Sequence, residues 1–212
     1  MNLATFRLRH GIATLREPLS QAAFLLKVQT GAYASAPHGL KMRILKRYLP
    51  HSGSVTLVET GTYFGDTVAA LKDVCSQIVS IEIDPGLHEY AQWRFRSSRN
   101  VRLVLGDCAT ELPSVLATIK GPAAFWLDGH WSGGITSRGA LDDPILLSLQ
   151  QIREYGENSH VLLIDDARCF DGRESRPHLG DVIALLRSIN PDYRILIHHD
   201  IISAVPPGPK DD

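Results

Sequence analysis

The sequence lacks the features that mark several classes of protein. Its longest wholly apolar runs are short, such as 22–26, whereas a helix that crosses a bilayer needs roughly 18 to 20 apolar residues, so we expect no transmembrane helix. It has no low-complexity tract and no excess of glycine or proline, which argues against a disordered or fibrous chain. With 212 residues, 44% of them hydrophobic, the chain can form one globular domain and has little length for a second.

Cysteine is also scarce. Cys75, Cys108 and Cys169 form no CxxC or Cys/His cluster, which argues against a zinc site, and their odd number and unrelated spacings argue against a disulfide framework. We expect reduced thiols and a cytoplasmic protein. The N-terminal residues contain no apolar run of signal-peptide length, so we expect no secretion. An organellar transit peptide stays open as an alternative, because such peptides also begin rich in arginine and poor in acids.

The charges are distributed unevenly along the chain, although the net charge is only -1. Residues 1–50 contain eight Lys or Arg and a single acid, Glu17, whereas the rest of the chain carries fourteen basic and 22 acidic residues. The basic segment predicts either an anionic partner, such as a membrane surface, or simply a solvated helix face. We expect no nucleic-acid partner, and the oligomeric state, including a homo-oligomer, stays open.

From residue 54 onward, β-branched apolar runs alternate with helical stretches, which is typical of βαβ units. The predicted parallel strands are 54–60, 77–84, 101–107, 122–128 and 160–166, with helices near 66–75, 86–97, 109–119, 141–155 and 179–189. The runs 193–199 and 200–206 leave no room for a crossover helix and predict an antiparallel hairpin at the sheet edge. The predicted fold class is α/β: a seven-stranded, mostly parallel, Rossmann-like sheet with helices on both faces.

Residues 1–53 are predicted to contain helices only and to form a segment that covers the substrate or docks to a partner, next to a domain over 54–212. Apolar residues at helical spacing follow Pro37, a residue well suited to a first helical turn. The stretch 3–28 is expected to be less regular, because Gly11 and Pro18 interrupt it.

The first predicted strand ends in an ExGxxxG motif formed by Glu59, Gly61 and Gly65. Ligands of open α/β sheets bind outside the carboxyl ends of the strands, and glycine there lets backbone N–H groups approach an anionic group. Glu82 ends the second strand at a distance along the chain that suits the ribose hydroxyls of either NAD or S-adenosylmethionine. The motif lacks the GxGxxG spacing of dinucleotide sites and the lysine of a P-loop. A glycine turn without any ligand is the structural alternative.

In these residues the chain resembles the class I S-adenosylmethionine-dependent methyltransferases. The resemblance covers about residues 54–206 and depends on VETGTYFG, SIEIDP and LVLGDC, in that order. It implies that the turn Gly61–Gly65 wraps the methionine part of S-adenosylmethionine, that Glu82 holds the ribose, and that Asp107 and Cys108 border the adenine. The other cofactor-binding residues that it implies are Glu59, Thr62, Tyr63, Thr67, Ile83 and Asp128. Tyr63 stands where the common motif has its middle glycine.

An acidic cluster is predicted at the ends of the fourth and fifth strands. Asp128 follows one strand, while Asp165 and Asp166 follow the other, and neighbouring strands lie roughly 5 Å apart. Three ionised carboxylates in a small volume need a cation or raised pKa values, and such oxygen ligands suit Mg²⁺ or another octahedral divalent ion. Alternatively, one or two of these acids cap the following helices, because adjacent residues of a regular strand point to opposite faces.

This cluster is similar to that of the metal-dependent O-methyltransferases of the catechol and macrocin types. The macrocin-like DG and IDD motifs imply that Asp128, Asp165 and Asp166 hold the metal. Such an ion would coordinate a substrate hydroxyl beside the methyl donor and lower its pKa. We predict that Asp128 and His130 are catalytic, with His130 as the base that takes the hydroxyl proton. The alternative for His130 is a surface histidine in a loop.

The sequence therefore predicts an enzyme, an S-adenosylmethionine-dependent O-methyltransferase assisted by Mg²⁺ or another divalent cation. Its acceptor is expected to be a hydroxyl of a small molecule or of a sugar-containing compound. Two other functions stay open: a NAD(P)-linked oxidoreductase on a Rossmann sheet, and a catalytically silent cofactor-binding protein that acts through its basic N-terminal segment.

Overall fold

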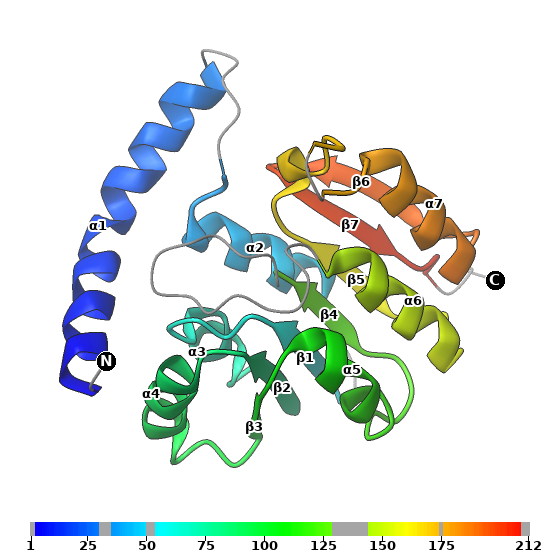
Figure 1. The fold of residues 1–212 in the computed structure, drawn as a ribbon. Helices are drawn as coiled ribbons and strands as arrows, with labels where there is room; N and C mark the ends of the chain where they lie inside the picture. The colour runs from blue at the N-terminus through cyan, green and yellow to red at the C-terminus, as the bar shows by residue number, and fades with distance from the viewer. Residues whose placement is uncertain (1–2, 30–34, 50–53, 129–143, 174–175, 209–212) are drawn as a thin grey trace.

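The computed structural model describes residues 3–29, 35–49, 54–128, 144–173 and 176–208. Seven strands form one sheet in the order β3-β2-β1-β4-β5-β7-β6 (Figure 1). Their bounds are β1 Thr56–Thr60, β2 Gln77–Glu82, β3 Val101–Leu105, β4 Ala124–Leu127, β5 Val161–Ile164, β6 Arg194–His198 and β7 Ile201–Val205. The first five strands pair in parallel, and β7 runs antiparallel to both β5 and β6. The predicted fold class and the C-terminal hairpin are confirmed.

Helices cover both faces of the sheet. Their bounds are α1 Leu3–Gln29, α2 His38–Tyr48, α3 Asp66–Leu71, α4 Pro85–Phe95, α5 Cys108–Leu116, α6 Ile145–Tyr155 and α7 Leu179–Ile189, with a 3-10 turn, η1, at Ala167–Cys169. Alternate residues of each strand serve the two cores. In β1, Leu57 packs with α2, α3 and α4, whereas Val58 packs with α5, α6 and α7. Because both faces are covered, β4 and β5 are apolar along their whole length, whereas β1 and β2 also carry buried polar residues.

The order of the strands determines where a ligand can approach. The chain runs from β1 to β2 and β3 on one side, and then returns to β4 and β5 on the other side of β1. The strand order therefore reverses between β1 and β4, the kind of position at which open α/β sheets bind their ligands. Because β1, β2, β4 and β5 are parallel, their carboxyl ends lie at this same edge of the sheet (Figure 1).

Residues 3–29 are helical, as predicted, but the expected interruption of this stretch at Gly11 and Pro18 is wrong. The structure has a single helix, α1, that continues through Gly11 and Pro18. A proline inside a helix costs about 3 kcal/mol, so contacts outside the helix must compensate. Phe6 is 3% exposed and packs with Phe64, Leu87 and Tyr90. None of the described helices has both the length and the apolar character needed to cross a membrane.

Polar contacts also attach α1 to the body of the protein. The His10 imidazole lies 2.7 Å from the Tyr90 hydroxyl and 2.8 Å from a carboxylate oxygen of Asp66. Arg94 donates to the same oxygen at 2.7 Å and to the Phe64 carbonyl at 2.5 Å. Burial opposes ionisation of Asp66, but Arg94 and His10 outweigh it and lower the pKa of this carboxyl. The N-terminal helix is therefore bound to the turn between β1 and α3.

We predict that Phe6→Ala lowers the free energy of unfolding by about 3 kcal/mol, because it empties a buried aromatic position. It should also increase hydrogen exchange of the backbone amides in the first half of α1. The control is Leu8→Ala on the same helix, where the side chain is 67% exposed and truncation should change stability by less than about 0.5 kcal/mol. Equal protection of α1 in Phe6→Ala and the unmodified protein would contradict the proposed attachment.

Candidate active site

The turn after β1 fits closely between its neighbouring strands. Gly61 has φ +89°, and a Cβ atom there would lie 2.5 Å from the carbonyl oxygen of Asp128 at the end of β4. The N–H groups of Gly61 and Thr62 donate to the carbonyl of Ile81 in β2, at 2.9 and 3.2 Å. Gly65, with φ +77°, approaches the Phe95 ring in the same way. Both glycines of the motif are therefore required by backbone conformation and by close approach.

Tyr63 occupies the position at which the resemblance places a further glycine. Its φ of +50° lies in the left-handed region, which a bulky residue adopts at a cost of roughly 1 to 2 kcal/mol. Its N–H donates to Oε2 of Glu82 at 2.7 Å. The backbone conformation that the motif needs is thus retained without glycine, and a hydrogen bond to a buried carboxylate helps to offset the strain.

Two buried glutamates lie next to the turn, and they are held differently. The Glu82 carboxylate accepts N–H groups of Tyr63 and Asp84, the latter at 2.8 Å, and burial raises its pKa. Glu59 accepts a hydrogen bond from the Ser80 hydroxyl at 2.5 Å and one from Thr67. Burial raises the pKa of Glu59 to about 8, so this carboxyl is mostly protonated at neutral pH. Glu82 ends its strand at the ligand-binding edge, whereas Glu59 stabilises the turn from within the sheet.

The remaining cofactor residues predicted from the sequence lie near the ends of β2 and β3. Ile83 is half-buried directly after β2. Asp107 caps α5, and its carboxylate accepts the N–H of Ala109 at 2.9 Å. Burial raises the pKa of the Cys108 thiol to about 12, which makes it an inert packing residue. These residues share the edge that holds Glu82, and their contact with a cofactor stays a prediction.

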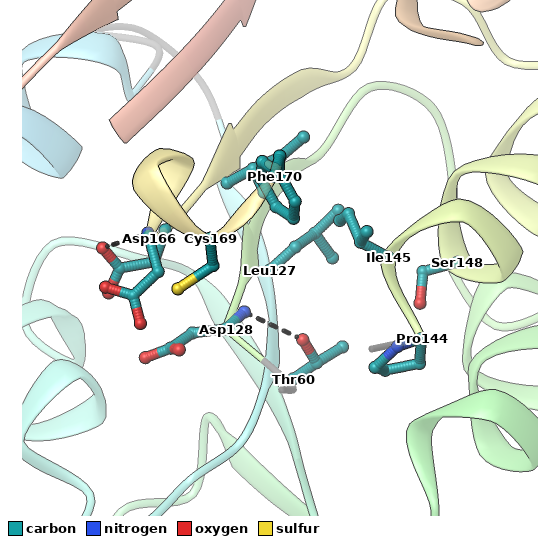
Figure 2. Close-up of a pocket in the computed structure, with 11 residues that line it drawn as sticks. Thr60, Leu127, Asp128, Pro144, Ile145, Ser148, Asp166, Cys169 and Phe170 are labelled. Atoms are coloured by element: carbon teal, nitrogen blue, oxygen red, sulfur yellow. Dashed lines mark hydrogen bonds between the residues drawn. The ribbon is translucent and has the colours of Figure 1, made fainter. Parts of the chain in front are cut away.

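The three acidic side chains of the predicted cluster do converge. Each of Asp128, Asp165 and Asp166 offers a carboxylate oxygen, and these atoms lie within 4.8 Å of one another. Figure 2 labels two of the three, Asp128 and Asp166. Strand β5 ends at Ile164, and Asp166 has φ +56°, so the chain has already left regular strand geometry. The alternation that would send Asp165 and Asp166 to opposite faces therefore does not apply, and Asp166, which directly precedes η1, makes no side-chain capping hydrogen bond to it.

Two cations from distant parts of the chain compensate the cluster. The Lys41 ammonium of α2 forms an ion pair with Oδ2 of Asp165, whose side chain is completely buried. Arg168 of η1 donates to Oδ1 of Asp166 at 2.5 Å and also pairs with Asp200. Sequence reasoning missed Lys41, because it lies 124 residues before Asp165 and no motif marks it. The position of Arg168 just after the fifth strand indicated that it lines the mouth of the site, but its pairing with Asp166 was not predicted.

The charges of the cluster influence one another. Burial raises the pKa of Asp165, and the neighbouring Asp128 raises it further, although Lys41 acts in the opposite direction. Burial raises the pKa of Asp128 as well. For Lys41, burial alone would favour the neutral amine, but the three aspartates outweigh it and raise the pKa, so the side chain stays an ammonium. The cluster thus consists of three carboxyl groups whose charges influence one another and of the Lys41 ammonium, which partly neutralises them.

Asp128 lines two pockets on either side of the cluster. One pocket, of about 110 Å³, lies against α2 and is also lined by His38, Lys41 and Thr67. The other is shown in Figure 2 and includes Thr60, whose hydroxyl accepts the N–H of Asp128 at 3.1 Å. His130, the predicted base, lies outside the described residues. Among the described residues, α2 therefore supplies one wall of the site.

Comparison with solved structures identifies the fold. The O-methyltransferase from Bacillus cereus, in complex with S-adenosylhomocysteine (SAH), aligns with a TM-score of 0.58 and 12% identity over 86% of this chain and 88% of that chain. Precorrin-6y C5,15-methyltransferase from Geobacter metallireducens GS-15 aligns with a TM-score of 0.57 and 13% identity, covering 82% and 94% of the two chains. The N-methyltransferase NodS from Bradyrhizobium japonicum WM9, with SAH, gives 0.53 and 13%, covering 80% and 87%.

These likenesses concern the fold, since the identities are low. The chain has the Rossmann-like fold of class I methyltransferases, and many of its structural neighbours are methyltransferases. No family model and no curated protein sequence matches it. The three proteins described above are named for transfer to oxygen, to the positions C5 and C15, and to nitrogen, so the fold does not determine the acceptor atom.

We predict that Gly61→Ala destabilises the protein by at least about 2 kcal/mol more than Gly121→Ala, measured by urea unfolding. Both glycines have positive φ, +89° and +75°, but a Cβ at Gly121 meets nothing within 4 Å. Backbone strain alone should cost about 1 kcal/mol at Gly121. The difference between the variants therefore measures the close approach to Asp128, and equal losses would show that this approach is not constrained.

Proposed function

We propose that the protein is an S-adenosylmethionine-dependent methyltransferase that transfers the methyl group to a hydroxyl of a small molecule or sugar-containing acceptor. The observation that carries the proposal is the arrangement at the switch point of the sheet. There the glycine turn is hydrogen-bonded to Glu82 and lies directly beside a cluster of three carboxylates. The fold, shared with methyltransferases that were solved with SAH, supports the same conclusion.

The residues present fit the methyl donor. In this proposal the turn Gly61–Gly65 surrounds the methionine part, and Glu82 accepts the ribose hydroxyls with the oxygen lone pairs that its backbone contacts leave available. Asp107 and Cys108 border the adenine. S-adenosylmethionine, when bound, supplies an electrophilic methyl group. The chain's residues position the donor and the acceptor, and such orientation can account for most of the acceleration.

The acidic cluster fits a hard divalent cation by its donor chemistry, because three carboxylate oxygens already lie together. Asp128, Asp165 and Asp166 would hold the ion, and a bound Mg²⁺ would polarise the acceptor hydroxyl. Asp128 lines both neighbouring pockets and is therefore placed to orient that hydroxyl. His130 stays the predicted base. All three cysteines are free, which supports a location in a reducing compartment such as the cytoplasm.

The oxidoreductase alternative is less well supported. A pyrophosphate needs close approach of the backbone, but this turn carries Tyr63, which is 44% exposed, and Phe64. The neighbours described above are methyltransferases. The silent cofactor-binding alternative differs only in turnover. Release of SAH from hydroxylated metabolites and glycans, assayed with and without Mg²⁺, tests it directly: binding of the donor without transfer to any acceptor would favour the silent protein.

We predict that Glu82→Gln weakens SAH binding at least tenfold, about 1.4 kcal/mol, measured by titration calorimetry. Glutamine has the same shape and keeps one oxygen, which can accept one of the two N–H groups that hold this side chain, but its amide nitrogen only donates and it offers the ribose hydroxyls no charged acceptor. The control is Glu89→Gln on α4, where the side chain is exposed. Binding of NADH but not SAH to the unmodified protein would contradict the proposed function.

A further inference from the structure

The acidic cluster already contains a cation of the protein itself, the Lys41 ammonium, which forms an ion pair with Asp165. We propose that Lys41 is the resident cation of this cluster, and that a divalent ion binds there only by displacing the Lys41 ammonium from Asp165. The inference rests on the proposed function, since it concerns how metal assistance is reached. It can be tested separately from the proposed function, however, because the property expected to change is the affinity for metal and not the rate of methyl transfer.

Lys41 is held in this position by the packing of its helix. It belongs to the first turns of α2, where its N–H donates to the Pro37 carbonyl at 3.1 Å. Met42 and Leu45 of the same helix are buried against the sheet. The Lys41 side chain is only 15% exposed and that of Asp165 is fully buried. A buried ion pair of this kind is maintained because the loss of either partner leaves an uncompensated buried charge.

The same atoms cannot serve Lys41 and a metal together. The ammonium contacts Oδ2 of Asp165 and interacts with the charges of Asp128 and Asp166, which are the other two carboxylates of the cluster. A divalent ion needs these oxygens at about 2.1 Å, and it would then face the ammonium across a distance of a few ångströms in a poorly solvated site. Arg168 cannot replace Lys41, since it lies at Asp166 and Asp200.

The test is the affinity of the purified protein for Mn²⁺, followed by the electron paramagnetic resonance of the free ion, with Mg²⁺ as competitor. We expect Lys41→Met to bind Mn²⁺ at least tenfold more tightly than the unmodified protein. Lys41→Arg should bind as weakly as the unmodified protein, because it retains the cation. Lys46→Met is the matched control, since it removes the same charge from an exposed position of the same helix.

Further variants locate the ion and guard against misfolding. Adding Asp165→Asn to Lys41→Met should abolish the gain in affinity. In the presence of a metal chelator, Lys41→Met should have a lower melting temperature than the unmodified protein, and addition of Mn²⁺ should raise it again. If Lys41→Met does not fold, Lys41→Gln, which can still hydrogen-bond Asp165, repeats the test. Equal Mn²⁺ affinities of Lys41→Met and the unmodified protein, or an equal gain in Lys46→Met, would overturn the proposal. SAH binding, measured on the same samples, tests the proposed function separately.

A different observation carries a second inference, about the outer face of α1. Leu8, Ile12 and Leu15 are 67%, 43% and 80% exposed. Their spacing along a helix places them on one face, opposite to that of Phe6, which packs against the body. The helix lies at the side of the molecule (Figure 1), and the exposed fractions of the three apolar side chains show that this stripe is open to solvent. Apolar stripes on a surface helix are characteristic of docking surfaces.

The charges beside the stripe indicate the kind of partner. Arg9 and Arg16 are exposed next to it, and no acidic residue precedes Glu17 in the sequence. Apolar residues flanked by arginine are the pattern of helices that lie in the interface of an anionic bilayer. Pairing of two copies through this face would instead bring like charges together. We infer that the outer face of α1 docks on an anionic lipid surface.

Sedimentation with phosphatidylglycerol and phosphatidylcholine vesicles tests this inference. We expect binding to the anionic vesicles only, reduced at least tenfold by Leu8→Ser combined with Leu15→Ser, and reduced by Arg16→Gln. The control is Val74→Ser, which changes a side chain that is 52% exposed on another surface. Equal binding of the double variant and the control would overturn the inference. So would a dimer in solution that the same two substitutions dissociate.

Discussion

The site depends on how the protein accommodates three carboxylates at one point of its sheet. Pairing of β4 with β5 brings Asp128, Asp165 and Asp166 together, and the sheet gives them little freedom to separate. Carboxylates that are buried and close need positive charge, protons or both. The protein supplies charge with Lys41 and Arg168, and burial raises the pKa of Asp165. The segment before the sheet is therefore part of the site, because it contributes the cation.

The glycine turn is constrained from several directions as well. Gly61 contacts the backbone of β4, Tyr63 is hydrogen-bonded to Glu82, and Asp66 is held by Arg94 and by His10 of α1. A ligand that approaches this turn meets a backbone already in place, and preorganisation of this kind reduces the entropic cost of binding. The N-terminal helices thus influence both halves of the proposed reaction: α1 contacts the turn for the donor, and α2 lines a pocket beside the carboxylates.

In the proposed function, different parts of the structure bind the methyl donor and the acceptor, so the fold alone does not identify the acceptor. The structural neighbours described above are named for methylation of oxygen, of nitrogen or of the positions C5 and C15. In the proposed function the turn and the strand ends hold the donor. The acceptor would then meet the residues that line the pocket beside the cluster, which include His38 and Lys41 of α2.

The sequence by itself determined the order of strands and helices, the glycine turn, Glu82 and the convergence of the three aspartates. These features follow from local patterns, because parallel strands necessarily bring their carboxyl ends to one edge. Only the tertiary structure decided that Lys41 and Arg168 neutralise the cluster, that Tyr63 adopts a positive φ, and that α1 is continuous through Pro18. Apart from the pairing of Arg168 with Asp166, which lies two residues away, these features depend on contacts between residues far apart in the chain. A lysine in a basic helix carries no local mark of the carboxylate that it will meet, since helix packing alone brings the two together.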